Sequence, residues 1–332
     1  MTIVELIASL GAQLRVFDLG RRIVELPAPE FAAFENGQAP YATPYLKHAW
    51  LGLLSWHNKK VDQNSIWFLK LPLDEQGLIV PAARDAFIQH WAQAVKTPNQ
   101  AAAPYSFKPD ANRMAYFHAL VLRSLSQQPT SFYTKARAYL SDTQGFENWQ
   151  NLGLQGLAEV VVRLCEQDNQ TLVMNALPHL PAVVRNVLLG FLENAQPDQN
   201  LTSALNDGLA QLVAQEPSAA DIAAYARALS NSINIAQRQQ LLAAILQHPH
   251  SQSVEILAAV ARDSWQDLQG SLLLSFLECL ARNEQGQPAF NALVADLLAL
   301  PGVRGQFMQV MASPEKSTEL ADAFTQLLQG VR

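Results

Sequence analysis

The sequence predicts a mainly α-helical protein, in which a small α+β module with an antiparallel sheet precedes a degenerate HEAT-like α-solenoid. Three observations lead to this prediction. The chain has 332 residues, more than one ordinary core requires. Runs rich in β-forming residues, bounded by turn signals, fall in its first part. From Ala111 onward, helical stretches of roughly 10–18 residues follow one another across short breaks, as antiparallel helix neighbours require.

The elements expected in residues 1–95 follow from local signals. Asp18-Leu19-Gly20 is a tight-turn signal between two strands, and Thr43-Pro44 combines a capping hydroxyl with a proline suited to the first helical position. Pro72 favours an edge or the exit of a strand. The predicted elements are a helix over 4–14, two strands within 14–26, a helix over 45–56, a hairpin of 65–73 with 78–80 across a turn at 74–77, and a helix from Pro81 to 95.

Residues 96–110 contain three prolines and no helical or strand period, which predicts a linker or an extended strap. Residues 111–332 form the predicted helical-repeat domain. Pro181, Ser218, Ser264 and Ser313 mark helix starts there, Ser218 and Ser264 with capping-box spacing. The expected helices cover 111–127, 131–141, 146–167, 169–179, 181–195, 199–215, 218–230, 235–247, 251–262, 265–283, 287–299, 302–312 and 315–330.

Several of these helices are apolar on more than one face, which is typical of helices sandwiched between layers in a stacked array. The stretches LLGFLENA and LLSFLECLA place Phe191 and Phe276 85 residues apart, about two units of a ~40-residue helix-pair repeat. The stretch LPHLPAVVRNVLLGFLE resembles a HEAT-type unit. A plain helical bundle is the competing interpretation.

Charge is distributed unevenly along the chain. Residues 1–135 carry 13 Lys and Arg against 10 Asp and Glu, whereas residues 136–332 carry 10 against 19. The acidic part is therefore a poor candidate for binding phosphate backbones. Cys165 and Cys279 are expected to be reduced and buried. The start of the sequence lacks the pattern of a signal peptide and no apolar run could cross a bilayer, so we expect a cytoplasmic protein without membrane contact.

Motifs for catalysis, cofactors or metals are absent from the sequence. GxxxxGK[ST], GxGxxG, HExxH, CxxC, EF-hand and GxSxG patterns do not occur. The sequence therefore predicts no catalytic, cofactor-binding or metal-binding residue. His248 and His250, two residues apart, suit a solvated turn better than a metal site. His48, His57 and His90 are expected to be separate side chains rather than one site.

An aromatic and basic set in the first module is the main candidate for partner binding. Four of the six tryptophans lie within the first 95 residues, and core filling by these rings is the alternative explanation. A recognition surface would combine rings with basic residues at its rim. The candidate residues are Arg21, Arg22, Trp50, Trp56, His57, Lys59, Lys60 and Trp67.

The stretches RVFDLGRRI, GQAPY (37–41), IWFLKLPLDEQGL and AARDAF resemble an uncharacterised proteobacterial family known only as a domain of unknown function. The resemblance covers the first 90 or so residues. It implies a bacterial cytoplasmic protein of this two-part layout and brings no activity or cofactor.

Three functions remain open from the sequence. The first is a non-enzymatic scaffold or adaptor whose long helical surface docks a protein partner. The second is an enzyme with a site at the junction of the two domains, where His57, His90 or Asp85 would serve as acid or base. The third is nucleic-acid binding through the basic N-terminal module.

Overall fold

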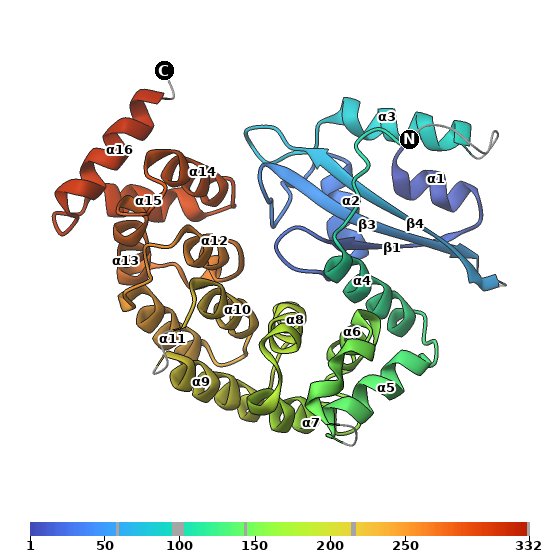
Figure 1. Cartoon of the computed structure of the whole chain (residues 1–332). Coiled ribbons are helices and arrows are strands. Elements are labelled where there is room, and N and C mark those ends of the chain that lie inside the picture. The colour runs from blue at the N-terminus through green and yellow to red at the C-terminus, as the bar shows by residue number, and fades with distance from the viewer. Residues whose placement is uncertain (58–59, 95–102, 143–144, 214–216, 331–332) are drawn as a thin grey trace. The chain divides into compact units, whose positions relative to one another are not determined.

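The computed structural model describes residues 1–57, 60–94, 103–142, 145–213 and 217–330 (Figure 1). The chain divides into two compact units. Residues 1–113 with 298–303 are here called the N-terminal unit, and residues 114–297 with 304–332 the helical unit. The described chain is mainly α-helical, with one four-stranded antiparallel sheet near its N-terminus, so the prediction of a mainly α-helical fold with a small antiparallel sheet in its first part is confirmed.

The sheet of the N-terminal unit has the strand order β2-β1-β3-β4, and every neighbouring pair is antiparallel. Gly52 on β3 lies opposite Phe17 on β1 and Phe68 on β4, which sets β3 at the centre. The strands are β1 (Gln13–Asp18), β2 (Val24–Leu26), β3 (His48–His57) and β4 (Lys60–Pro72), and the helices around them are α1 (Ile3–Ser9), α2 (Ala28–Glu35) and α3 (Pro81–Ala94).

The main core of this unit lies between one face of the sheet and the three helices. Leu51 and Leu53 on β3 and Leu69 on β4 point to this face because side chains alternate along a strand. Phe31 of α2 and Phe87 of α3 pack against it. Each such side chain, fully removed from water, contributes about 1.5–3 kcal/mol to folding.

The prediction of a helix over 45–56 is wrong, because this stretch forms the central strand β3. Leu51 to Ser55 are buried, which is typical of a strand with neighbours on both sides. A continuous apolar run of this kind cannot be distinguished from a buried helix by its period. The turn before it also lacked a signal: Leu46 and Lys47 have φ angles of 50° and 60°, although neither is Gly or Asn.

The predicted hairpin of 65–73 with 78–80 is present only at its turn end, where Asp74 N–H donates to the Leu78 carbonyl at 3.0 Å and Val80 N–H to the Pro72 carbonyl at 3.4 Å. β4 pairs with β3 along its length, and residues 78–80 contribute one isolated bridge, Ile79 to Leu73. The predicted turn is present, since the Asp74 carboxylate accepts the N–H groups of Gln76 and Leu78. The two strands within 14–26, the strand exit at Pro72 and the helix from Pro81 are confirmed. Helix α2 was not predicted.

The segment predicted as a linker or strap covers the outer edge of β4. Lys70 N–H donates to the Tyr105 carbonyl at 2.8 Å, and Phe107 N–H donates to the Phe68 carbonyl at 3.1 Å. Residues 96–102 of this segment lie outside the described residues.

The helices from Ala111 onward match the predicted ones closely in number and order. They are α4 (Ala111–Ser124), α5 (Ser131–Leu140), α6 (Leu154–Val162), α7 (Asn169–Ala176), α8 (Ala182–Leu192), α9 (Gln199–Val213), α10 (Ala219–Leu229), α11 (Ile235–Gln247), α12 (Val254–Asp263), α13 (Gly270–Ala281), α14 (Gln287–Leu298), α15 (Val303–Ala312) and α16 (Thr318–Gly330), with short 3-10 helices at Phe146–Asn151, Leu177–His179 and Trp265–Asp267.

The structure differs from the predicted helical elements at several positions. Three predicted helices, 146–167, 169–179 and 265–283, each split into a 3-10 turn and an α-helix. Ser218 caps α10 as predicted, accepting the Asp221 N–H at 3.2 Å, whereas Ser264 makes no capping bond. Helix α16 begins later than predicted, and Ser317 rather than Ser313 caps it. Cys165 is exposed, contrary to prediction, and Cys279 is buried as predicted.

The helical unit is built from neighbours in two rows (Figure 1). In one row α6 packs against α8, α8 against α10, and α10 against α12; in the other, α5 packs against α7 and α7 against α9. Helices α6, α8, α10, α12 and α14 begin 28 to 37 residues apart. Among the described residues, no helix has both the length and the apolar character needed to cross a membrane.

Candidate functional site

The tryptophans of the candidate binding set lie on opposite faces of the sheet. Trp50 and Trp56 share one face of β3, because six positions separate them along the strand. The Lys70 ammonium lies 4.5 Å from the centre of the Trp50 ring, and the Arg15 guanidinium 5.6 Å from that of Trp56. Trp67 lies on the other face, where its ring is 5.6 Å from that of Trp91. Trp67 therefore belongs to the packing of the core.

The basic residues of the set do not form one accessible rim. Arg21 is 2 % exposed, and its Nε donates to the Pro44 carbonyl at 2.9 Å. Arg22 is half-buried. Lys59 and the side chain of Lys60 lie outside the described residues. The sequence did not foresee the burial of Arg21, since nothing local distinguishes it from Arg22.

The histidines and the acid considered for catalysis are engaged separately. The His48 ring lies 2.6 Å from the Leu46 carbonyl, and the exposed His57 ring 3.3 Å from the Gly11 carbonyl. Asp85 pairs with Arg84 at 2.8 Å. His90 is half-buried on α3. Within the described ranges, no group of three or more His, Cys, Asp or Glu side chains is placed to hold a metal ion.

His248 and His250 lie in the turn that follows α11. Their ring centres are 5.3 Å apart, and the His250 N–H donates to Nδ1 of His248 at 3.1 Å. Burial and the neighbouring His250 lower the pKa of His248. We therefore assign His248 and His250 a structural role in this turn.

A buried polar cluster ties the end of β1 to the segment 41–44. Asp18 is 1 % exposed; one carboxylate oxygen accepts the Gly20 N–H at 2.6 Å, and the other accepts the Thr43 hydroxyl. Burial raises the pKa of Asp18 to about 6, against the lowering effect of these two bonds. Burial and the nearby Asp18 also raise the pKa of Tyr41. Because Asp18 is enclosed, we assign the cluster to structure.

An apolar groove beside this cluster is the strongest candidate site. Its volume is about 410 Å³, within the range of small-ligand pockets. Helix α2 forms one wall, the segment 39–42 forms the other, and Leu26 of strand β2 closes one side. The lining residues are Leu26, Pro29, Glu30, Phe31, Ala33, Phe34, Ala39, Pro40, Tyr41 and Ala42.

The groove has an aromatic floor and an open rim. Phe31, Phe34 and Tyr41 are each 3 % exposed and belong to the core of the unit, with the Phe34 and Tyr41 ring centres 5.0 Å apart. Pro29 and Pro40 are exposed at the rim. The floor is therefore fixed by the same packing that holds the sheet to α2.

The sequence of α2 carries a signal for this groove. Pro29 lies in the first turn of α2, where proline is tolerated, and Glu30 is an acidic residue of the same turn. The helix APEFAAFE has apolar residues on more than its core-facing side. That second apolar side indicates a helix with something further to contact.

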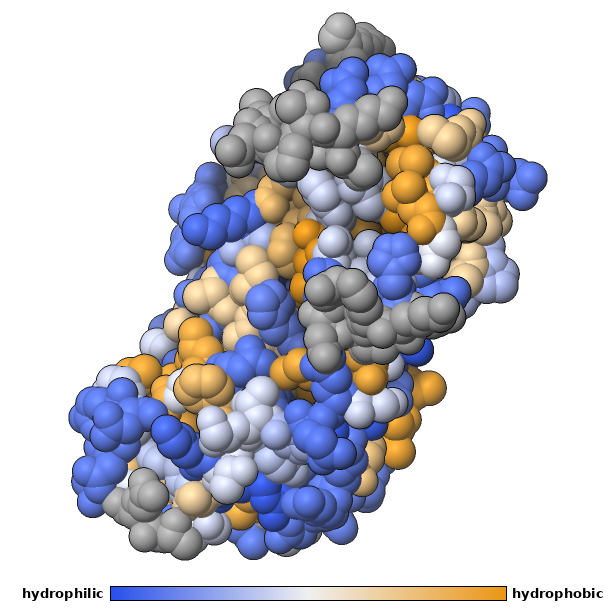
Figure 2. Space-filling model, turned by 90° about the vertical axis from the view of Figure 1, so that its right-hand side faces the viewer, coloured by the Kyte–Doolittle hydropathy of each residue, from blue (hydrophilic) through white to orange (hydrophobic). Residues whose placement is uncertain are grey.

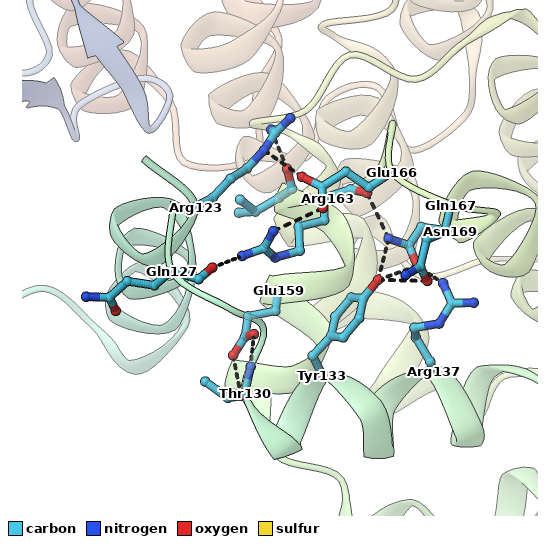
Figure 3. A network of polar contacts seen from close by, with 11 residues as sticks. Arg123, Gln127, Thr130, Tyr133, Arg137, Glu159, Arg163, Glu166, Gln167 and Asn169 are labelled. Carbon is cyan, nitrogen blue, oxygen red and sulfur yellow. Dashed lines mark hydrogen bonds and ion pairs between the residues drawn. The ribbon is translucent and has the colours of Figure 1, made fainter. Parts of the chain in front are cut away.

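The helical unit contains a network of polar side chains around its first helices (Figure 3). The Glu159 carboxylate on α6 is fully buried and accepts both the N–H and the hydroxyl of Thr130, the residue that caps α5. The Asn169 amide on α7 donates to the Arg163 carbonyl at 2.8 Å. Each of these contacts ends on the start or end of a helix.

The arginines of this network also bind main-chain carbonyls. Arg123 donates to Val162 at 2.6 Å, and Arg163 donates to Gln127 at 3.0 Å, while both pair with Glu166. Figure 3 shows these side chains reaching across from neighbouring helices. The network thus holds the first helices of the unit together through side-chain bonds to main-chain groups of neighbouring helices.

Comparison with known proteins identifies the family but no activity. The family model described as "Protein of unknown function (DUF3549)" matches residues 1–328. The searches of curated proteins and of solved structures found no match. The chain therefore belongs to the DUF3549 family.

Proposed function

We propose that this member of the DUF3549 family is a non-enzymatic protein–protein interaction scaffold. In this proposal the helical unit is a solenoid of stacked helix pairs that offers a long docking surface, and the N-terminal unit adds the apolar groove. The observation that carries the proposal is the recurrence, along the helical unit, of side-chain hydrogen bonds that join residues at a similar sequence separation.

These bonds join positions 28 to 39 residues apart from the beginning to the end of the unit. The Arg238 guanidinium binds Asp267 through two bonds of 2.8 and 2.9 Å, and Cys279 donates to the Leu246 carbonyl at 3.2 Å. A recurring separation close to the spacing of the helix starts supports a repeated pair as the building unit.

The use of buried polar groups also supports a scaffold. Glu35, Asp18 and Glu159 accept main-chain N–H groups, and Arg21 donates to a main-chain carbonyl. Side chains that hold the backbone in this way are occupied by structure rather than directed toward a reactant.

The exposed apolar side chains are dispersed. On the face shown in Figure 2, hydrophilic residues separate the apolar ones into small patches. Val183 is 56 % exposed at the start of α8, and Ile233 is 64 % exposed before α11. Dispersed contacts suit a partner held at several points along an extended surface better than one buried at a single hydrophobic patch.

The test is affinity capture with the full chain as bait, from native lysate of the cells that make it. Two baits, tagged at opposite ends, are compared with the tag alone, and captured material is quantified and cross-linked for mass spectrometry. We expect one protein at a fixed stoichiometry with both baits, cross-linked to several helix pairs of the helical unit. Absence of a stoichiometric partner in repeated captures with both baits would overturn the proposal.

A further inference from the structure

The surroundings of the groove carry negative charge. Residues 23–46, which include every residue that lines it, contain three glutamates and no Lys, Arg or His. Glu35 is buried and accepts the main-chain N–H groups of Ile3 and Val4, so it is used within the fold. Glu30 is exposed at the rim. Among the described residues that line the groove, Glu30 alone is charged.

Two arginines of the N-terminal unit pair with carboxylates other than that of Glu30. Arg15 pairs with Glu25 at 3.6 Å. Arg84 donates to the Glu35 carbonyl at 2.8 Å and pairs with Asp85. A ligand that places an apolar group on the floor therefore meets a carboxylate at the rim, and a cation beside the apolar group would be favoured there.

The groove also adjoins the open edge of the sheet. Leu26 both lines the groove and lies on β2, which is an outer strand with no further strand beside it in the described part of the chain. The edge of a sheet can accept an added extended segment through main-chain hydrogen bonds, while side-chain pockets select its residues.

The opposite edge of the same sheet shows such an arrangement within the chain itself. Residues 105–107 hydrogen-bond to β4 in an extended conformation, and the Phe107 ring centre lies 4.8 Å from that of Trp50. The β4 edge is thus covered by an extended segment with one aromatic anchor, whereas the β2 edge adjoins a groove with a comparable aromatic floor.

We propose that the groove binds an extended segment of a partner protein, in which a bulky apolar side chain enters between α2 and residues 39–42 and a neighbouring Lys or Arg pairs with Glu30. The inference rests on the proposed scaffold function and assigns the chemistry of one of its contacts. A carboxylate ligand such as a fatty acid is disfavoured, because Glu30 would repel its head group.

The experiment uses the full chain with 13C-labelled alanine methyl groups, because Ala33, Ala39 and Ala42 line the groove. The probe is the peptide acetyl-Ala-Lys-Phe-Lys-Ala-amide, compared with the same peptide carrying Glu in place of Lys and with laurate. We expect the basic peptide to shift these three methyl signals saturably, and the acidic peptide and laurate to bind several-fold more weakly.

Two variants test the roles of the charge and the groove. Glu30→Gln should weaken the basic peptide about two- to five-fold, the effect of one exposed ion pair. The matched control is Glu255→Gln, which removes an exposed glutamate from the first turn of α12, a residue that does not line the groove, and should leave binding unchanged. Ala33→Phe, which fills the groove, should abolish binding.

Equal binding of the acidic peptide, tighter binding of laurate, or no change at the three methyl groups would overturn the inference. Shifts of these signals on concentrating the chain without peptide would do so as well, because they would identify a second copy as the occupant. Partner capture that survives Ala33→Phe would leave the scaffold proposal standing, so the two proposals can fail separately.

Discussion

The sheet of the N-terminal unit and the helix pairs of the helical unit differ in what determines their local structure. In α10 the cap Ser218 and the hydrogen bonds of the helix all lie within one short stretch of sequence. In β3 the backbone is satisfied by β1 and β4, and Leu51 lies opposite Asp18, 33 residues earlier. A local pattern therefore suffices to identify the helices, whereas the central strand depends on residues far from it in the chain.

Individual carboxyl groups of the two units have pKa values shifted in opposite directions. Burial raises the pKa of Asp18 and Glu35 in the N-terminal unit. In the helical unit, the hydrogen bond from Arg137 lowers the pKa of Asp168. Asp18 and Glu35 are thus enclosed against main-chain donors, whereas Asp168 pairs with an arginine of α5.

The largest expected effect is at Gly156 of α6, where local and non-local rules disagree. Alanine is the better helix former by about 1 kcal/mol, so local propensity alone predicts that Gly156→Ala stabilises the unit. A Cβ at this position would lie 2.3 Å from the Phe132 carbonyl oxygen and 3.0 Å from Ala136 Cβ on α5. We expect the variant to lower the free energy of unfolding by about 2 kcal/mol, measured by urea titration with circular dichroism at 222 nm.

The matched control is Gly190 of α8, where a Cβ would meet no atom within 4 Å. Gly190→Ala should therefore raise the free energy of unfolding by up to about 1 kcal/mol. If Gly156→Ala also stabilised the protein, the close contact of α5 with α6 at this position would be contradicted. Local helix propensity would then determine the stability of the variant more than the contact with α5 does.

The next effect concerns the buried acid of the N-terminal unit. The folded protein holds the Asp18 proton up to about pH 6, whereas the ordinary pKa of Asp is 3.8. The stabilisation that this proton provides is complete below the ordinary pKa and is lost as the pH rises through about 6. Lowering the pH from 7 to 5 should therefore raise the free energy of unfolding of this unit by about 1 kcal/mol through Asp18.

Tryptophan fluorescence during urea titration measures this effect, in a background where Trp149 and Trp265 are replaced by Phe so that the remaining tryptophans all lie in the N-terminal unit. Asp18→Asn removes the titrating group, and the gain between pH 7 and pH 5 should shrink by the same amount. If the free energy of unfolding of Asp18→Asn rose as much between pH 7 and pH 5 as that of the original protein, Asp18 would not be the group responsible. The raised pKa of Asp18 would then be contradicted.

Much of the fold could be predicted from the sequence, for identifiable physical reasons. Helix starts such as Ser218 and Pro181 carry their signal within four residues, and they were placed to within one or two positions. The central strand β3 could not be predicted in this way. Leu51 to Leu54 form a continuous apolar run, and such a run is equally typical of a strand buried on both faces and of a buried helix.

The candidate site was harder to predict than the fold. Composition was enough to identify the aromatic set. It could not show that Trp50 and Trp67 lie on opposite faces of the sheet, because that depends on both residues lying in strands. The groove combines α2 with Tyr41, and these meet through core packing that no local pattern encodes.

The smallest effect concerns the turn before β3, whose missing signal led to the error. Leu46 and Lys47 occupy the left-handed region in a two-residue turn, which Tyr45 and His48 close by donating to each other's carbonyls at 3.0 and 3.1 Å. This conformation is unfavourable by roughly 1–2 kcal/mol for an ordinary residue, and Gly adopts it freely while losing 0.5–1 kcal/mol of chain entropy, by rough estimate.

Lys47→Gly should therefore raise the free energy of unfolding of the N-terminal unit by about 0.5 kcal/mol, measured by the same tryptophan fluorescence. The control is Gln76→Gly, at an exposed turn residue outside the left-handed region, which should lower it by a similar amount because only the unfolded chain gains freedom. Equal losses from both substitutions would contradict the left-handed geometry at Lys47. An increase in the free energy of unfolding for Lys47→Gly alone would show that Leu46 and Lys47 adopt a conformation that their own side chains disfavour. The pairing of β3 with β1 and β4 would then be what holds the turn in this conformation.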